Sequence, residues 1–462
     1  MENLELLLSQ IQNWVWGIPL LTLLLGTGVY LTFLLRGVQF RYLGYALKQV
    51  FAKQAKDSQG DISQFEALMT SLAGAIGTGT IVGVSTAIVV GGLGSMFWMW
   101  VTAFLGMATK YAESLLAVKY RTIDDRGEMM GGPMQYMERG LGWKWIAVLF
   151  AILGSFAAIG TGNLVQVNAI TETVVKVWGA DPLWTGITLA AMTGLIVLGG
   201  IRSIGHVAGV MVPIMALFYL TAGIIILGIH FDKIPAAIYL ILKSAFNGQA
   251  AFGGFAGATI MMSIQMGVAR SIFSNEAGLG ISSIAAAAAK TDSPGRQAMI
   301  TMTGALMSTV IVCSITGLVL AVTGVLGQTN AAGQPLTGAG MAIEAFDSSI
   351  FGGSYIVAIG LILFAFSTVI AWGYYGEKCC EYILGERSVL FYRLLFTLLV
   401  VPGAMLKMET VWHLADIMNG LMVIPNLIAL IMLSDVLVAE TKQFLESLDK
   451  EKMTATPVTT NS

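Results

Sequence analysis

The residues with the clearest chemical potential lie between Leu72 and Gly83, where the sequence reads LAGAIGTGTIVG. The surrounding apolar run, from about Phe65 to Gly92, is long enough to cross a bilayer. Each glycine costs about 1 kcal/mol in a helix interior relative to alanine, so several at the centre of a span predict a broken helix. Backbone groups freed by a break persist at membrane depth only where they are buried or line a cavity.

Such a break presents two half-helix ends with opposite preferences. We expect the N–H groups of Gly77, Thr78 and Gly79 to hold a carboxylate, because the start of a helix favours anions. The carbonyls before the break, such as those of Ala73 and Ile76, would then point at a cation. The alternative is an unbroken helix whose glycines serve close packing, but the threonines interleaved with the glycines favour the break.

Adjacent hydroxyls occur in the apolar stretch LFAFSTVIAWGYYGEK, at Ser367 and Thr368. With the carbonyl of Phe364, one turn earlier, they offer the oxygen ligands that a hard cation prefers. The alternative is that both hydroxyls bond back to carbonyls of the preceding turn. Trp372 lies four residues after Thr368 on the same helix face. It would either wall the cavity or anchor the helix at the membrane interface.

Amide side chains also fall inside the expected spans. The stretch FAAIGTGNLVQVNAI places Asn163 and Gln166 at i and i+3, and Gln265 lies within a later span. Amides at membrane depth either hold helices together or bind a ligand. Gln166 and Gln265 are the preferred candidates for ligand binding, although packing is the commoner role.

Ionisable residues within spans are functional hypotheses by default. Lys110 and Glu113, at i and i+3 near the cytoplasmic end of the third span, are interpreted as a structural pair at the interface. The segment SNEAGLG, shortly after Arg270, is expected to cap the seventh span at its cytoplasmic end and to contact Arg270 in a gate. Asp416 has no obvious partner in the sequence.

Composition identifies the class of protein. The 462 residues are 56% hydrophobic and only 11% charged, with a mean hydropathy of +0.77, whereas soluble proteins carry about 25% charge. Long apolar runs predict an all-α polytopic membrane protein. The net charge of −2 gives no indication of nucleic acid, and the three cysteines have no metal-site or disulfide spacing. The acidic N-terminus is not that of a cleavable signal peptide.

Eleven spans are expected. They begin near Trp14, Phe65, Gly94, Trp145, Pro182, Val207, Ala251, Gln297, Phe351, Val389 and Val411. With the N-terminus outside, 20 Lys and Arg residues fall in cytoplasmic segments against 4 in outer segments, so the positive-inside rule predicts N-out and C-in.

The seventh span resembles the second, because Gly253, Gly254, Gly257 and Gly267 interrupt it around polar residues. Each broken span would begin a five-span unit, and the odd number makes the second unit inverted. Paired broken spans in inverted repeats indicate a secondary transporter with its site at the repeat interface. The expected division is an N-terminal helix and cytoplasmic amphipathic segment (1–60), a first repeat (61–230), an outer amphipathic helix (231–250), a second repeat (251–437) and a cytoplasmic tail (438–462).

These motifs resemble the alanine or glycine:cation symporter family (sodium:alanine symporters). The resemblance covers roughly residues 10–440 and is carried by GTGTIVGVSTAI, FWMWVTAFLGMATKYAE, GGPMQYMERGL, TGNLVQVNAI, ARSIFSNEAGLG and AFSTVIAWGYYGEK. It implies the leucine-transporter-type fold, a 5+5 inverted repeat preceded by one N-terminal helix. It also implies symport of a small neutral amino acid with Na⁺, or sometimes H⁺, across the plasma membrane of a prokaryote.

The resemblance also implies site residues. The expected Na⁺ ligands are Ala73, Ile76, Phe364, Ser367 and Thr368. The expected substrate-binding residues are Gly77, Thr78, Gly79, Thr80, Asn163, Gln166, Ile264, Gln265 and Trp372. This chain departs from the family pattern at Thr80, where an asparagine is usual, at Ser271 for a glycine and at Ala286 for a histidine. The change at Thr80 lies next to the expected pocket and bears on substrate identity.

The sequence therefore predicts a symporter that imports alanine or glycine with Na⁺ by alternating access, with no other cofactor and no enzymatic activity. One alternative is a symporter of the same fold for another neutral amino acid, such as glutamine, or one coupled to H⁺. Another is a channel or a non-transporting sensor of the same fold.

Overall fold

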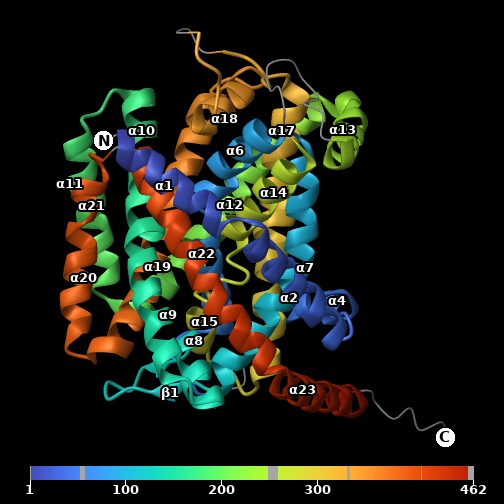
Figure 1. Ribbon diagram of the computed structural model, residues 1–462, viewed down its shortest axis with the longest axis vertical. Helices are drawn as coiled ribbons and strands as arrows, with labels where there is room; N and C mark the ends of the chain where they lie inside the picture. Colours follow the sequence, from blue (N-terminus) through green and yellow to red (C-terminus); the bar gives the residue numbers. More distant parts are fainter. Residues whose placement is uncertain (1, 53–57, 248–258, 330–332, 407, 456–462) are drawn as a thin grey trace, which may run out of the picture.

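The computed structural model describes residues 2–52, 58–247, 259–329, 333–406 and 408–455, and these are mostly helical (Figure 1). A strand pair, β1 (Thr122–Ile123) and β2 (Met129–Met130), forms an antiparallel hairpin. The N-terminal end lies at the upper edge of Figure 1, and the described C-terminal helix lies at the lower edge.

The first half of the chain, up to residue 247, is almost entirely helical. Its elements are α1 (Glu2–Val15), α2 (Ile18–Leu34), α3 (Val38–Arg41), α4 (Leu43–Val50), α5 (Gln64–Ala75), η1 (Thr78–Thr80), α6 (Val82–Gly91), α7 (Gly94–Lys119), α8 (Pro133–Gln135), η2 (Tyr136–Gly140), α9 (Lys144–Ala157), η3 (Ala158–Leu164), α10 (Val165–Trp178), α11 (Pro182–Val197), α12 (Gly200–Ile229), η4 (Phe231–Lys233) and α13 (Ile234–Asn247).

The second half of the chain is also mostly helical. Its elements are α14 (Ile260–Asn275), α15 (Ser283–Ala287), α16 (Pro294–Ala305), η5 (Leu306–Cys313), α17 (Ser314–Thr323), α18 (Gly338–Asp347), α19 (Gly353–Leu384), α20 (Ser388–Leu398), α21 (Val400–Gly403), α22 (Met408–Met432) and α23 (Ser434–Ala455).

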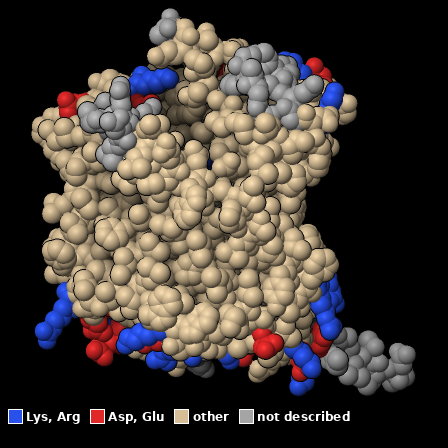
Figure 2. Space-filling model, in the orientation of Figure 1, with Lys and Arg blue, Asp and Glu red and all other residues tan. Residues whose placement is uncertain are grey.

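An apolar band separates two charged edges of the molecule. Figure 2 shows Lys, Arg, Asp and Glu gathered at the upper and lower edges of the visible face, with other residues between them. Among the described residues, six helical segments are long and apolar enough to cross a membrane, and three shorter apolar helices accompany them. This pattern is that of a multi-pass membrane protein.

Helix α19 lies at the centre of the bundle. It packs against α5, α9, α10, α12 and α18, and most of its side chains from Phe364 to Cys379 are buried. Because lipid contacts would expose one face of a peripheral helix, burial all round identifies α19 as the element that other spans surround.

The second expected span is broken where the sequence predicts. Helix α5 begins at a capping box, in which Ser63 accepts from the Glu66 N–H and the Glu66 carboxylate accepts from the Ser63 N–H. It ends at Ala75, and the chain turns through Ile76 and an extended Gly77 into the short 3₁₀ turn η1 before α6 begins at Val82.

The seventh span is broken at a different place from the one predicted. Gly267 lies inside the uninterrupted helix α14, and Gly253, Gly254 and Gly257 lie outside the described residues. The break runs instead from Glu276 to Ser282, where Gly278 and Gly280 have φ of +91° and +76°, a region that favours glycine. Gly267 therefore does not interrupt the span, and the structure has a break at Gly278 and Gly280 that the sequence analysis did not place.

Candidate functional site

The first break depends on close approach of three helices. A Cβ on Gly77 would lie 2.4 Å from the Thr368 hydroxyl and 3.0 Å from Oε1 of Gln166, and one on Gly79 would lie 2.6 Å from the Phe273 ring. Larger residues would push α19, α10 or α14 away from the break. The absence of a side chain at Gly77 and Gly79 therefore lets the three helices pack closely and leaves the backbone of the break accessible.

The expected cation ligands meet at this break. Ser367 Oγ lies 3.2 Å from the Ala73 carbonyl oxygen and 2.8 Å from that of Phe364. Thr368 Oγ1 lies 2.9 Å and 3.1 Å from the same two oxygens. The hydroxyls thus bond back to their own helix and also reach α5, so both sequence interpretations describe part of the arrangement. Within the described residues, neither hydroxyl bonds the Ile76 carbonyl.

The N–H end of the break is held by an amide. The Thr78 N–H donates to Oε1 of Gln166 at 3.1 Å, and Nε2 of Gln166 donates to the Thr161 carbonyl. Gln166 therefore offers Thr78 the kind of oxygen that a carboxylate would offer. The Thr78 hydroxyl is buried and finds no hydrogen-bond partner among the described residues.

Trp372 lies against the end of α5 at the same break. Its ring is fully buried, and Nε1 lies 3.4 Å from the Gly74 carbonyl. A Cβ on Gly162 would lie 2.1 Å from Cβ of Trp372, so this glycine lets η3 approach α19. Of the two interpretations of Trp372, the wall of the site agrees with this position and the interfacial anchor does not.

Thr80 stabilises the break itself. Its hydroxyl donates to the Gly77 carbonyl at 2.8 Å, and its side chain is fully buried. The hydroxyl thereby satisfies a carbonyl that the break frees from the helix. The residue that departs from the family pattern is thus part of the backbone turn.

Three expected substrate residues lie elsewhere. Nδ2 of Asn163 donates to the Phe396 carbonyl of α20 at 2.6 Å, and Gln265 donates to the Trp16 carbonyl, between α1 and α2. Ile264 is a partly buried residue of the apolar core, and it precedes Phe273 on α14 by about two and a half turns. The structure does not bring these three side chains to the first break.

The second break is held by buried charges that the sequence analysis interpreted as an interfacial pair. Nζ of Lys110 donates to the Asn275 carbonyl at 2.7 Å, at the C-terminal end of α14. A cation is favourable there because the helix dipole is negative at that end. Lys110 is only 1% exposed, so it is not an interfacial residue.

Glu113 binds the opposite side of the second break. Its Oε1 accepts from the N–H groups of Gly278 and Gly280 at 2.9 and 3.0 Å, and from the Asn426 amide at 2.7 Å. Glu276, at the C-cap of α14 in a left-handed conformation, links the two breaks. Its Oε1 lies 3.0 Å from the Cβ position of Gly74.

The sequence of this chain is clearly related to the sequences of known proteins. The profile described as the sodium:alanine symporter family matches residues 1–458. The chain belongs to the sodium:alanine symporter family. It is 51% identical over 457 residues to the sodium/alanine symporter AgcS of Methanococcus maripaludis, covering 97% of this chain and 99% of AgcS. Membership identifies a symporter rather than an enzyme, as the sequence predicts, and implies Na⁺ as its coupling ion.

Solved structures establish the fold of this family member. MhsT, in complex with L-phenylalanine, matches with a TM-score of 0.57 at 12% identity, covering 83% of this chain and 99% of MhsT. A manganese transporter from Eremococcus coleocola matches with a TM-score of 0.53 at 12% identity, covering 83% of each chain. The symporter therefore shares a transporter fold with proteins that have little sequence in common with it.

Two stacked aromatic rings and an ion pair lie next to the first break of the symporter. The Phe273 ring stacks on Trp412 at 5.1 Å, and Nη2 of Arg270 pairs with Asp416 Oδ2 at 3.1 Å. Arg270 thus lies inside α14, and Asp416 has the partner that the sequence did not reveal. The contact expected between Arg270 and SNEAGLG is replaced by this pairing with α22.

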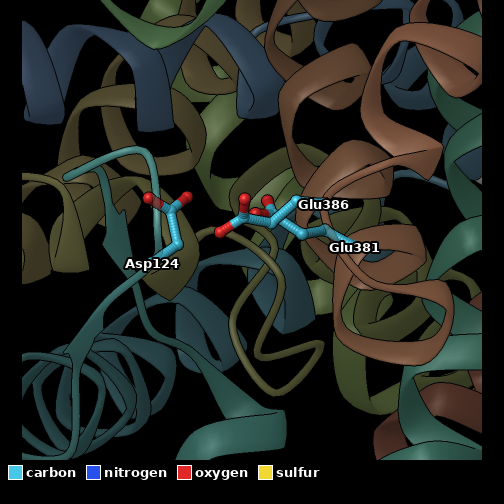
Figure 3. A group of neighbouring side chains, drawn as sticks. All are labelled: Asp124, Glu381 and Glu386. Atoms are coloured by element: carbon cyan, nitrogen blue, oxygen red, sulfur yellow. The ribbon is translucent and has the colours of Figure 1, made fainter.

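An acidic cluster lies where the hairpin meets the end of α19. Figure 3 shows the carboxylates of Asp124, Glu381 and Glu386 close together. Lys378 pairs with Asp124 and Glu381 at 3.3 and 3.0 Å, and Arg126 pairs with Glu381 at 3.0 Å. Burial acts to raise the pKa of Asp124, but the Glu128 N–H and the Lys378 ammonium outweigh it and lower that pKa. The described contacts fit an ion-pair network that fastens the hairpin to α19 rather than a metal site.

Proposed function

We propose that this protein imports alanine or glycine together with Na⁺ by alternating access. The observation that carries the proposal is the meeting of two hydroxyls of α19 with the carbonyls of Ala73 and Phe364 at the first break. Oxygen atoms from a broken span and from its neighbour form the kind of ligand set that a hard cation prefers.

The cation would connect α5 to α19. Ser367 and Thr368 carry lone pairs besides the protons that they donate, so their oxygens and the two carbonyls can turn toward one Na⁺. The Ile76 carbonyl, at the C-cap of α5, is the fifth proposed ligand. Binding of Na⁺ would fix the end of α5 and so preorganise the N–H groups that follow it. Coupling is then the difference in substrate affinity with and without the cation.

The substrate would bind beside the cation as a zwitterion. Its carboxylate would replace Oε1 of Gln166 at the Thr78 N–H, with the backbone of Gly77 and Gly79 and the Thr78 hydroxyl nearby. The side chains that hydrogen-bond the Thr78 N–H and the Ala73 carbonyl are an uncharged amide and two hydroxyls, which supports a neutral amino acid. Phe273 packs against Gly79 and Trp372 reaches the Gly74 carbonyl, and two such large rings favour a substrate with a small side chain, such as alanine or glycine.

We also propose the arrangement of the chain in the membrane. Eleven spans would form two inverted five-span repeats, at 61–230 and 251–437, after one N-terminal span, with α13 as an outer helix and α23 as part of the cytoplasmic tail. The N-terminus would lie outside the plasma membrane of a prokaryotic cell. An inward Na⁺ gradient would then drive import, and each charge would gain about 2.3 kcal/mol per 100 mV.

Uptake of labelled alanine into proteoliposomes tests the proposal. We expect accumulation above the external concentration when Na⁺ is higher outside, and its loss when Na⁺ is equal on both sides. Unlabelled alanine and glycine should compete more strongly than glutamine, which needs a larger pocket.

Other outcomes of the uptake assay would indicate one of the alternative functions. Uptake that follows an imposed proton gradient without Na⁺ would indicate H⁺ coupling. Equilibration without accumulation would indicate a channel, and the absence of any uptake by a monodisperse preparation that binds alanine would indicate a sensor.

A further inference from the structure

A hollow of about 380 Å³ lies where the end of α2 and the short helix α3 meet the C-terminal helix α23. Residues 34–42 form one of its walls, and residues 438–449 form the other. Its volume is within the range of small-ligand pockets, about 300–1,000 Å³. Figure 1 places α23 at the lower edge of the bundle, and Figure 2 shows charged side chains of both signs along that edge.

The wall formed by α2 and α3 is basic and lies where a membrane span ends. The apolar segment Leu6–Leu34 is long enough to cross a membrane, and Arg36 follows it by two residues, which places Arg36 at the depth of lipid headgroups. The guanidinium carbon of Arg41 lies 5.6 Å from the centre of the Tyr42 ring. Both arginines are exposed, and within the described residues neither guanidinium has a carboxylate partner. Two guanidinium groups are therefore available to a phosphate.

The wall formed by α23 carries an acid. Lys442, Leu445 and Glu446 line the hollow at i, i+3 and i+4, so they share one face of the helix. The helix is fixed beside them, because the Tyr111 hydroxyl donates to Oγ1 of Thr441 at 3.1 Å. Nζ of Lys442 lies 3.9 Å from Oε1 of Glu446, and 62% of the Glu446 side chain is exposed. Such a pair is weak, so the Glu446 carboxylate can turn to another cation in the hollow.

Apolar side chains border the hollow. Leu34 and Leu445 line it from opposite walls. Phe33 and Phe40, which are next to lining residues in the sequence, are 79% and 57% exposed. Large exposed apolar side chains at the end of a membrane span indicate contact with lipid. The hollow thus offers charges for a headgroup and an apolar border for the chains attached to it.

We propose that this hollow binds a membrane phospholipid of the phosphatidylethanolamine class. The phosphate lies between Arg36 and Arg41, the ammonium donates to Glu446, and the acyl chains run past Leu34 toward the apolar band. Charge complementarity identifies the headgroup, because a phosphate alone would face the Glu446 carboxylate without a cation between them. Asp449 lines the same wall and adds to its negative charge. A choline headgroup carries the same charges, but its quaternary ammonium has no N–H to donate.

Native mass spectrometry of the purified full-length protein, titrated with lipids of identical acyl chains, tests this site. Phosphatidylethanolamine should bind about three- to fivefold more tightly than phosphatidylglycerol or phosphatidylcholine, the range of one exposed charge pair. Glu446→Gln should remove this preference by weakening phosphatidylethanolamine alone. Arg41→Gln should weaken all three lipids by about fivefold. Lys48→Gln, at an exposed cation of α4 outside the hollow, is the matched control and should leave every affinity unchanged.

Several outcomes would overturn the lipid site. Equal affinities of the unmodified protein for the three lipids would do so without any variant having to fold, and so would tighter binding of phosphatidylglycerol. A preference retained in monodisperse Glu446→Gln, or unchanged affinities in monodisperse Arg41→Gln, would also refute the assignment. Glycerophosphoethanolamine has the same headgroup without acyl chains and should bind at least about tenfold more weakly, whereas equal binding would refute a membrane lipid. Uptake is not measured in these tests, so their failure leaves the proposed function unaffected.

Discussion

The two helix breaks differ in what satisfies their backbone groups. The donors and acceptors that hydrogen-bond the backbone of the first break are uncharged, namely Gln166, Ser367, Thr368 and Trp372. The second break has a lysine at its carbonyl end and a glutamate at its N–H groups. Lys110 and Glu113 each have the sign that their end of the break prefers.

This difference indicates that the two breaks have different roles. A break that already contains its counter-charges gains little from external ions, so the second break is expected to be permanently stabilised. The first break offers the same two electrostatic preferences without fixed charges, so a cation and a carboxylate can supply them reversibly. Variants at the second break should therefore affect folding, and variants at the first break should affect ligand dependence.

The largest effect is expected for Glu113→Ala at the second break. The substitution leaves two backbone N–H groups and the Asn426 amide without their acceptor, and each unsatisfied donor costs about 1–3 kcal/mol. We expect a large loss of monodisperse protein and a lower unfolding temperature that Na⁺ does not restore. Ser114→Ala, at an adjacent buried hydroxyl, is the control. Equal stability of the two variants would contradict the assigned role of Glu113.

Gly77→Ala should abolish transport while the protein still folds. The added Cβ would lie 2.4 Å from the Thr368 hydroxyl, which displaces α19 from the proposed cation site. Alanine uptake should fall by at least about tenfold, equivalent to about 1.4 kcal/mol. Gly83→Ala is the matched control on the same span, because its Cβ would lie 3.6 Å from its nearest neighbour. Similar uptake by both variants would refute the close-approach argument.

Thr368→Ala should act on Na⁺ dependence rather than on folding. Loss of one oxygen ligand should raise the Na⁺ concentration for half-maximal uptake by about tenfold, or about 1.4 kcal/mol. Added Na⁺ should also raise the unfolding temperature of the unmodified protein more than that of the variant. Thr173→Ala removes a hydroxyl that bonds within its own helix and should leave both measurements unchanged. An unaltered Na⁺ requirement in Thr368→Ala would remove this residue from the site.

The smallest effect is expected at Thr80. Thr80→Val loses the hydrogen bond to the Gly77 carbonyl, worth about 1 kcal/mol or about fivefold in alanine affinity. Thr80→Ser keeps the bond and should behave as the unmodified protein. Competition by alanine, glycine and glutamine measures the affinities. A changed rank order in Thr80→Ser would show that the side chain contacts the substrate directly.

The sequence predicted the first break, and it indicated the two hydroxyls that reach the break, because both signals are local. Glycines concentrated in one span, and adjacent hydroxyls in another, can be recognised without knowledge of packing. Gln166 and Gln265 were preferred over Asn163 as ligand-binding amides, but only Gln166 lies at the first break, because Gln265 donates to the Trp16 carbonyl. Asn163 lies in the π-helical segment η3, where the angular spacing of a regular helix does not apply, so it turns toward α20 instead.

The second break could not be located from local pattern. Its position depends on Lys110 and Glu113, which lie about 165 residues away along the chain and in a different helix. The detectable signal was an ionisable pair within an apolar span, and its interpretation as interfacial overlooked the possibility of a broken partner helix. The pairing of Arg270 with Asp416 was hidden for the same reason, because nothing in either span identifies the other.

The continuity of α19 gives it a mechanical role. The helix runs unbroken from Gly353 to Leu384, so the proposed cation ligand Thr368 and the ion-paired Lys378 belong to one rigid rod and lie about 15 Å apart. A tilt of about 10° pivoting at Lys378 would move Thr368 by about 2.5 Å over that span, comparable with the length of its hydrogen bond to α5. The ion pairs of Lys378 with Asp124 and Glu381 hold this part of α19, so a tilt of α19 about them would change the distance between Thr368 and α5.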